Sequence, residues 1–172
     1  MANKPKIEIN PEFRQALEVM ENTRQHVFVT GKAGTGKSTL LEYFRGQTDK
    51  QIAVLAPTGV AAINVGGQTI HSFFGFKPNV SLDKVRKARN QKQAQDLYSN
   101  LDAIVIDEIS MVRADLLDCV EKFLRLNLDK NRVFGGLQMI FIGDLYQLPP
   151  VVTKHDREAF SQKYDSPYFF SA

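Results

Sequence analysis

The sequence predicts an α/β fold in which helices cover both faces of a parallel β-sheet. Four short apolar segments, at 26–30, 52–56, 103–107 and 139–143, are rich in β-branched and aromatic residues, as expected of strands buried on both sides. Helical patterns lie between them. Strands that alternate with helices indicate parallel pairing through right-handed crossovers.

The first third of the chain supplies the first helix, strand and crossover. Asn10 is expected to cap a helix whose first residue is Pro11, and apolar residues then recur at helical spacing as far as Met20. The strand at 26–30 leads into a glycine-rich turn. The segment "KSTLLEYF" after this turn has the pattern of a helix.

The middle of the chain is more irregular. Thr58 is expected to cap a short helix in "GVAAINV", which Gly66 and Gly67 end. An aromatic-rich run follows from His71 to Phe76. The basic segment "KVRKARNQK" (84–92) is predicted to be a helix with Ser81 as its cap.

The last third contains an amphipathic helix and the final strand. In "ADLLDCVEKFLRLNL" the residues Leu117, Val120, Leu124 and Leu128 line one face. The strand at 139–143 ends in "GDLYQLPPV", where two prolines stiffen the chain directly after Leu148.

Composition restricts the class of protein. The 172 residues suit one domain, and a hydrophobic content of 43% excludes a disordered chain. The single cysteine, Cys119, excludes an internal disulfide and a cysteine-cluster zinc site. No apolar stretch approaches the ~20 residues of a membrane span, and the N-terminal residues lack a signal-peptide core, so we expect a cytoplasmic protein without membrane contact. The net charge of +3 is compatible with a polyanionic partner.

The clearest chemical motif is "GKAGTGKS", from Gly31 to Ser38, between a strand and a helix. Its glycines let the backbone curl so that successive N–H groups point at phosphate oxygens, and the helix N-terminus adds its positive end. Lys37 would reach the β- and γ-phosphates, and the Ser38 hydroxyl would bind Mg²⁺. The motif predicts binding of Mg·ATP or a related nucleotide.

Two acids follow the strand at 103–107 in "AIVIDEIS". Open α/β sheets bind their ligands at the carboxyl ends of the strands, where Asp107 and Glu108 lie. We assign Asp107 to the metal and Glu108 to the general base that activates water.

In the final segment, Gln147 is the candidate for a residue that contacts the nucleotide. If its strand lies beside the phosphate-loop strand, Asp144 and Gln147 emerge near the γ-phosphate. A neutral amide donates to a phosphate oxygen and accepts from water, so Gln147 is predicted to sense the γ-phosphate.

Four segments in this order resemble the first RecA-like lobe of PIF-family (petite integration frequency) helicases: "GKAGTGKST", "APTGVAAINVGGQTIHSFF", "IDEISMV" and "GDLYQLPPV". These are superfamily 1 helicases similar to RecD that move 5′ to 3′ on single-stranded DNA, and their roles include DNA repair, recombination and telomere maintenance. The resemblance implies a P-loop NTPase fold and places the 139–143 strand between the phosphate-loop strand and the Asp-Glu strand.

The resemblance also implies site residues. It makes Gln15 the reader of adenine, and Lys37, Glu108 and Gln147 catalytic. The nucleotide would be bound by Gln15, Gly31, Ala33, Gly34, Thr35, Gly36, Lys37, Ser38 and Thr39, and Mg²⁺ by Ser38 and Asp107. Pro57, Thr58 and His71 would contact single-stranded DNA.

Some residues near the predicted DNA path have simpler explanations. Phe73 and Phe74 are expected to be core residues rather than base-stacking platforms, whereas Thr58 and His71 are assigned to DNA. The basic segment 84–92 either follows a phosphate backbone or is a solvated helix face, and the second interpretation is the commoner one.

Two other functions compete with the helicase. The first is a GTPase, because the tetrapeptide "TKHD" (153–156) superficially matches a guanine-reading motif. This tetrapeptide follows prolines rather than a strand, however, which argues against a GTPase. A DNA-independent ATPase of the AAA type that acts on protein partners is the main alternative, and it predicts turnover indifferent to single strands.

A helicase of this type has two lobes, and the sequence contains motifs of the first lobe alone. We therefore expect residues 1–172 to be one RecA-like lobe of a monomeric motor. Without the arginines of a second lobe, which contribute about 10³–10⁵ in rate, it should hydrolyse ATP very slowly and should not unwind DNA.

Overall fold

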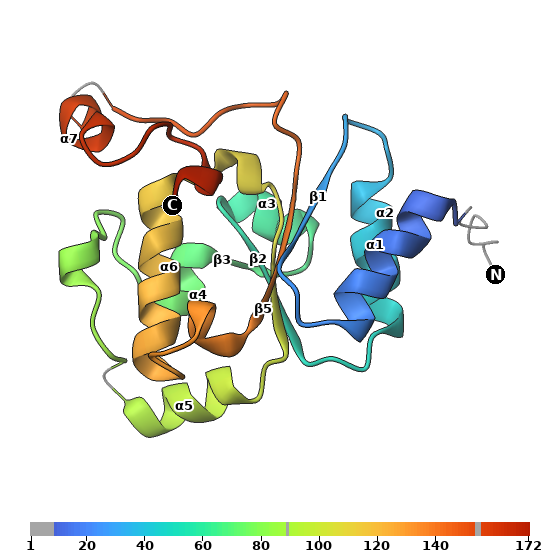
Figure 1. Cartoon of the computed structure of the whole chain (residues 1–172), viewed down its shortest axis with the longest axis horizontal. Coiled ribbons are helices and arrows are strands. Elements are labelled where there is room, and N and C mark those ends of the chain that lie inside the picture. Colours follow the sequence, from blue (N-terminus) through green and yellow to red (C-terminus); the bar gives the residue numbers. More distant parts are fainter. Residues whose placement is uncertain (1–8, 89, 154–155) are drawn as a thin grey trace.

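The sheet has five parallel strands in the order β1-β5-β4-β2-β3, with helices on both of its faces (Figure 1). The structure is a computed structural model that describes residues 9–88, 90–153 and 156–172. It confirms the predicted α/β class and the position of the last strand between the phosphate-loop strand and the Asp-Glu strand.

The strands are β1 (Val27–Thr30), β2 (Ile52–Ala56), β3 (Gln68–Thr69), β4 (Ala103–Ile106) and β5 (Gln138–Gly143). The α-helices are α1 (Pro11–Asn22), α2 (Lys37–Gln47), α3 (Gly59–Asn64), α4 (Ile70–Phe74), α5 (Gln91–Ser99), α6 (Ala114–Asn127) and α7 (Arg157–Ser161). Single 3₁₀ turns are η1 (Leu82–Lys84), η2 (Ile109–Met111), η3 (Val133–Gly136) and η4 (Phe169–Ser171). The two-residue edge strand β3 was not predicted.

Strand side chains alternate between two hydrophobic cores, one on each face of the sheet. Val105 and Ile140 pack with α1 and α2, while Ile104 and Met139 pack with α4 and α6. All of these side chains are fully buried, as are both central strands. Burial on both faces, which was predicted for all four apolar segments, is therefore confirmed for β4 and β5. It is wrong for β1, which lies at the edge of the sheet and is only partly buried, and β2 is buried only in its second half.

A polar cluster fastens the C-terminal end of α1 to the sheet. The Lys50 ammonium donates to the carbonyl oxygens of Met20 and Thr23 at 2.6 and 2.7 Å and to Gln138 Oε1 at 2.7 Å. The amide of Gln138 donates in turn to Gln25 O at 2.9 Å. At the other end of α1, Asn10 Oδ1 accepts from the Phe13 N–H at 2.8 Å, as the capping pattern predicts.

The predicted helix at 84–92 is wrong in its first half. Residues 85–88 have no regular structure, and α5 begins at Gln91 behind the cap of Asn90; Arg89 lies outside the described residues. Ser81 precedes only the turn η1 and its side chain makes no capping bond. Burial of Val85 and the contacts of this segment with α6 outweigh its local helical propensity.

Candidate functional site

The carboxyl ends of three neighbouring strands bring the predicted nucleotide residues together. Thr30, the last residue of β1, pairs with Gly143 of β5, and Ile106 of β4 pairs with Phe141. The segments that begin at Gly31, Asp144 and Asp107 therefore leave the same edge of the sheet side by side. Ligands of open α/β sheets bind at this edge.

The phosphate loop has the curled backbone that its glycines predict. Gly34 and Gly36 have φ angles of 79° and 90°, which side chains other than glycine rarely adopt. The Lys37 ammonium donates to the carbonyl oxygens of Gly31 and Lys32 at 2.6 and 3.0 Å. The loop thus holds a cation at its centre and directs the N-terminus of α2 at the space that a phosphate would fill.

The acidic pair lies half-buried across from this loop. Burial raises the pKa of Asp107, and an accepted hydrogen bond from the Glu108 N–H and the charge of Lys37 oppose that rise. Burial and then the charge of Asp107 raise the pKa of Glu108, with a further contribution from Asp144. A carboxylate whose pKa is raised toward neutrality is a better proton acceptor, as a general base requires.

Glu108 also has a strained backbone. Its φ and ψ angles of 51° and 40° lie in the left-handed region, which is unfavourable for a glutamate. Its neighbour Asp107 is held by a main-chain bond to Leu55 O at 2.9 Å. Both acids follow directly after the buried strand β4, yet each remains only half-buried.

Gln147 is exposed and depends on Asp144 for its orientation. Asp144 is only 3% exposed, and its carboxylate accepts from the Tyr146 N–H at 3.0 Å and from Gln147 Nε2 at 3.2 Å. Pro150 is buried and Pro149 is exposed. Sequence reasoning assigned no separate role to Asp144, although its position between the strand and Gln147 could have indicated one.

A cleft of about 530 Å³ lies between α1 and the phosphate loop. Gln15 lines it together with Gly31, Thr35, Gly36 and Lys37. A purine base attached to phosphates in the loop fits this arrangement. Sequence reasoning missed Phe13, which also lines the cleft and which the helical pattern indicated only as a core residue.

The donor set fits Mg²⁺. Ser38 supplies an exposed hydroxyl and Asp107 a half-buried carboxylate, and Mg²⁺ is usually bound by one or two such oxygens together with phosphates and water. Within residues 9–88, 90–153 and 156–172 no group of three or more His, Cys, Asp or Glu side chains could hold a metal ion by itself. The remaining predicted loop residues, Ala33 and Thr39, lie in the loop and the first turn of α2.

The predicted DNA residues occupy the other half of the same edge. Pro57 and Thr58 follow β2, and His71 is the second residue of α4 directly after β3. Thr58 Oγ1 caps α3 by accepting from the Ala61 N–H at 3.2 Å, which leaves its hydroxyl hydrogen free to donate. Burial lowers the pKa of His71, so its imidazole is neutral at pH 7.

Several other residues lie in the core or form ion pairs. Phe74 is buried in the core, as predicted, and Phe73, which was also predicted to be a core residue, is half-buried. Cys119 is buried in the same core. Arg113 is paired with Asp115 at 2.7 Å. In the tetrapeptide 153–156, Lys154 and His155 lie outside the described residues. Across the described part of the chain, none of the helices has the length and apolar character needed to cross a membrane.

Comparison with known proteins identifies a family that covers most of the chain. The family model described as PIF1-like helicase matches residues 8–166. The ATP-dependent DNA helicase PIF1 of Emericella nidulans is 39% identical over 170 residues, which cover 90% of this chain and 22% of the relative. Human ATP-dependent DNA helicase PIF1 is 43% identical over 129 residues, covering 74% and 20%.

Solved structures give the same result. A Bacteroides Pif1 helicase in complex with ADP-AlF3 and ssDNA superimposes with a TM-score of 0.87 and 41% identity over 97% of this chain and 39% of the other. The Candida albicans Pif1 helicase superimposes with a TM-score of 0.76 and 35% identity, over 97% and 37%. The chain spans less than half the length of each of these four relatives.

Proposed function

The chain belongs to the PIF1-like helicase family, and from this premise we propose that it is the ATP-binding, DNA-gripping RecA-like lobe of a 5′ to 3′ DNA helicase. The observation that carries the proposal is the shared edge of the sheet. Nucleotide residues follow β1, β5 and β4, whereas the candidate DNA residues follow β2 and β3. One rigid sheet therefore connects the two ligands.

The proposed chemistry assigns a task to each nucleotide residue. Lys37 and the loop N–H groups hold the phosphates, Ser38 and Asp107 hold Mg²⁺, and Glu108 accepts a proton from the attacking water. Bound Mg²⁺ supplies charge neutralisation at the phosphates. Gln147, oriented by Asp144, reports whether the γ-phosphate is present.

On the DNA side, Pro57, Thr58 and His71 contact single-stranded DNA. A neutral imidazole donates or accepts a hydrogen bond without bringing a charge into the contact. An uncharged contact suits a motor, which must release each nucleotide of the DNA strand as it moves.

We propose that the motor functions as a monomer in the cytoplasm or, where the source has organelles, in the compartment that contains its DNA. One solved relative is described as two coordinating Pif1 helicases at forked dsDNA. Self-association on a fork is therefore the competing state, and sedimentation with and without a forked duplex distinguishes the two.

The test is ATP hydrolysis by the full-length protein that carries this lobe, with and without a single-stranded oligonucleotide. We expect strong stimulation by the oligonucleotide. Turnover unchanged by DNA would favour the DNA-independent ATPase that acts on protein partners, and the assignments of Pro57, Thr58 and His71 would then be withdrawn.

A further inference from the structure

A cavity of about 850 Å³ lies between α4, α6 and the irregular segment that precedes α5. None of its lining residues belongs to the nucleotide cleft. We call it the basic aromatic pocket, after the rings of Phe73, Phe74, Phe76, Tyr98 and Phe123 and the cations Lys77, Lys84, Arg86 and Lys87 that line it.

The rings of the pocket are only partly closed over. Phe74 and Phe123 are buried and form part of the core, whereas Phe73 and Phe76 are half-buried. The Phe73 ring meets Phe74 edge to face at 5.0 Å, and the Phe76 ring stacks on Phe74 at 5.4 Å. Two aromatic side chains thus retain accessible surface beside the cavity.

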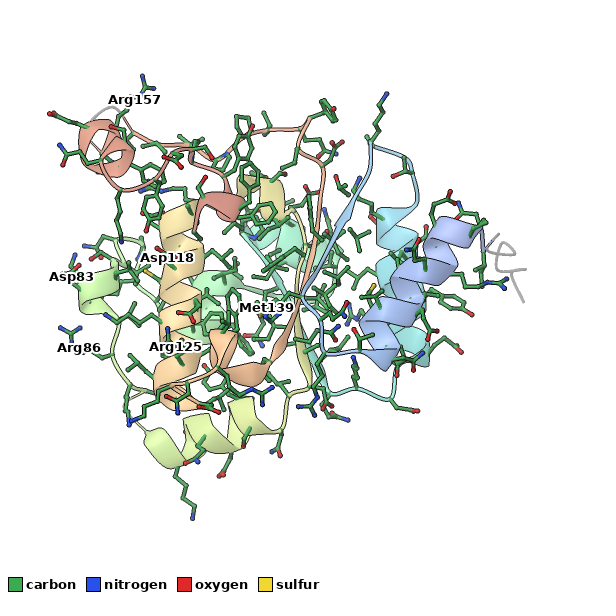
Figure 2. The ribbon with its side chains drawn as sticks, in the orientation of Figure 1. Asp83, Arg86, Asp118, Arg125, Met139 and Arg157 are labelled. Atoms are coloured by element: carbon green, nitrogen blue, oxygen red, sulfur yellow. The ribbon has the colours of Figure 1, made fainter. Side chains whose placement is uncertain are left out.

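The charges of the pocket have one sign. Four cations line it, and none of the lining residues in the described part of the chain is acidic. Among the described residues none of the four takes part in an ion pair. Arg86 donates to the carbonyl oxygens of Asp83 and Val85, and both Asp83 and Arg86 project outward on the side of α6 away from α1 (Figure 2). The lining is therefore complementary to an anion.

The irregular wall is held in place by α6. The Lys122 ammonium donates to Leu82 O at 2.7 Å, and the Asn127 side chain accepts from the Ala88 N–H at 2.9 Å. Val85, between these two bonds, is 3% exposed. A segment fastened at three points holds the backbone that carries these cations in place, so the wall of the pocket is formed before any ligand arrives.

We propose that the basic aromatic pocket is a second contact for single-stranded nucleic acid, with a base against Phe73 or Phe76 and phosphates against Lys77 and Lys87. Unpaired bases stack on aromatic rings without sequence preference, and cations beside the rings follow the backbone. Double-stranded DNA does not expose its base faces and is not expected to enter.

The pocket adjoins the DNA residues already assigned. Helix α4 carries His71 near its start and Phe73 and Phe74 at its end, and a helix of five residues is only about 7 Å long. Only the length of this short helix therefore separates His71 from the pocket. This inference rests on the proposed function, because it extends the same DNA path.

The test reverses two exposed charges at the pocket. In the full-length protein, Lys77→Glu with Lys87→Glu is compared with Lys130→Glu with Arg157→Glu, which makes the same change of net charge at exposed positions elsewhere; Arg157 lies well away from Arg86 in Figure 2. Fluorescence anisotropy measures the dissociation constant for oligo(dT) at several salt concentrations.

We expect the pocket variant to bind about tenfold more weakly at low salt and the control variant less than twofold. Each phosphate contact contributes about 0.7 to the slope of log K against log salt for single strands, so the slope should fall by about 1.4. Oligonucleotides substituted with 5-bromodeoxyuridine should cross-link to Phe73 or Phe76 in the unmodified protein.

Equal binding by both variants, with cross-links only around His71, would overturn the second contact and leave the proposed function intact. No binding of oligo(dT) by the unmodified protein would overturn the proposed function and this inference together.

Discussion

Asp144 Oδ2 accepts a hydrogen bond from Gln147 Nε2 at 3.2 Å, so a buried carboxylate fixes the orientation of an exposed amide. The same carboxylate accepts the N–H of Tyr146 through Oδ1. With its amino group held by Asp144, the carbonyl oxygen of Gln147 remains available to a water molecule. Asp144 is therefore a positioning residue for the proposed phosphate sensor.

Loss of this bond should lower turnover more than nucleotide binding. We expect Asp144→Asn to lower the DNA-stimulated kcat about tenfold, which is the worth of one charge-assisted hydrogen bond, with KM for ATP changed less than threefold. Gln147→Ala should do the same. The double variant should be no slower than the slower single variant, because the residues act as a unit; additive losses would contradict the coupling.

Glu108→Gln should separate binding from chemistry. The amide keeps the size of the side chain but accepts no proton, so we expect turnover to fall by about 10²–10⁴. Mg·ATP binding, measured by calorimetry, should stay within about threefold. Asp107→Asn is the matched comparison and should weaken Mg²⁺-dependent nucleotide binding. Normal turnover of Glu108→Gln would refute the general-base assignment.

The same variant should change how stability depends on pH. The pKa of Glu108 is raised in the folded state by burial and by Asp107, so ionisation of Glu108 destabilises the fold above its unfolded pKa. Glu108→Gln should therefore be more stable than the parent at pH 7. The difference should disappear as the pH falls below about 4.3, the usual pKa of a glutamate. Urea unfolding at several pH values measures it, and a constant difference would be the contrary result.

Replacement of two different glycines by alanine should have opposite effects on the free energy of unfolding. A Cβ atom on Gly67 would lie 2.2 Å from the backbone oxygen of Val54, so Gly67→Ala should lose about 2–3 kcal/mol of unfolding free energy. Gly46, near the end of α2, has no atom within 4 Å of an added Cβ. Gly46→Ala should gain about 0.5–1 kcal/mol. Thermal and urea unfolding measure both, and similar losses would show that the close approach at Gly67 is not decisive.

Patterns of local origin could be predicted from the sequence. The apolar runs located four strands to within one residue at either end, and the cap and proline at Asn10 and Pro11 located the start of α1. The phosphate loop was equally clear, because two of its glycines adopt positive φ angles that few other residues adopt. Each of these features is encoded by neighbours in the chain.

Features that depend on tertiary contacts could not be predicted. The segment 85–88 contains helix-forming residues, yet Val85 is buried and two hydrogen bonds to α6 keep the chain in an irregular conformation. The anchoring of Gln147 by Asp144 is a side-chain contact in a turn, which spacing does not specify. The basic aromatic pocket unites α4, α6 and an irregular segment, and no single motif contains all three.

The position of β5 has a consequence for how this protein tolerates change. It separates the strand of the phosphate loop from the strand of the acidic pair, and two parallel spacings of about 4.8 Å set that separation through main-chain hydrogen bonds. Substitutions among the apolar residues of β5, from Met139 to Ile142, therefore leave the distance between the two halves of the site unaltered, provided that these residues remain apolar. The sequence of this strand can therefore change during evolution while the distance between the phosphate loop and the acidic pair stays constant.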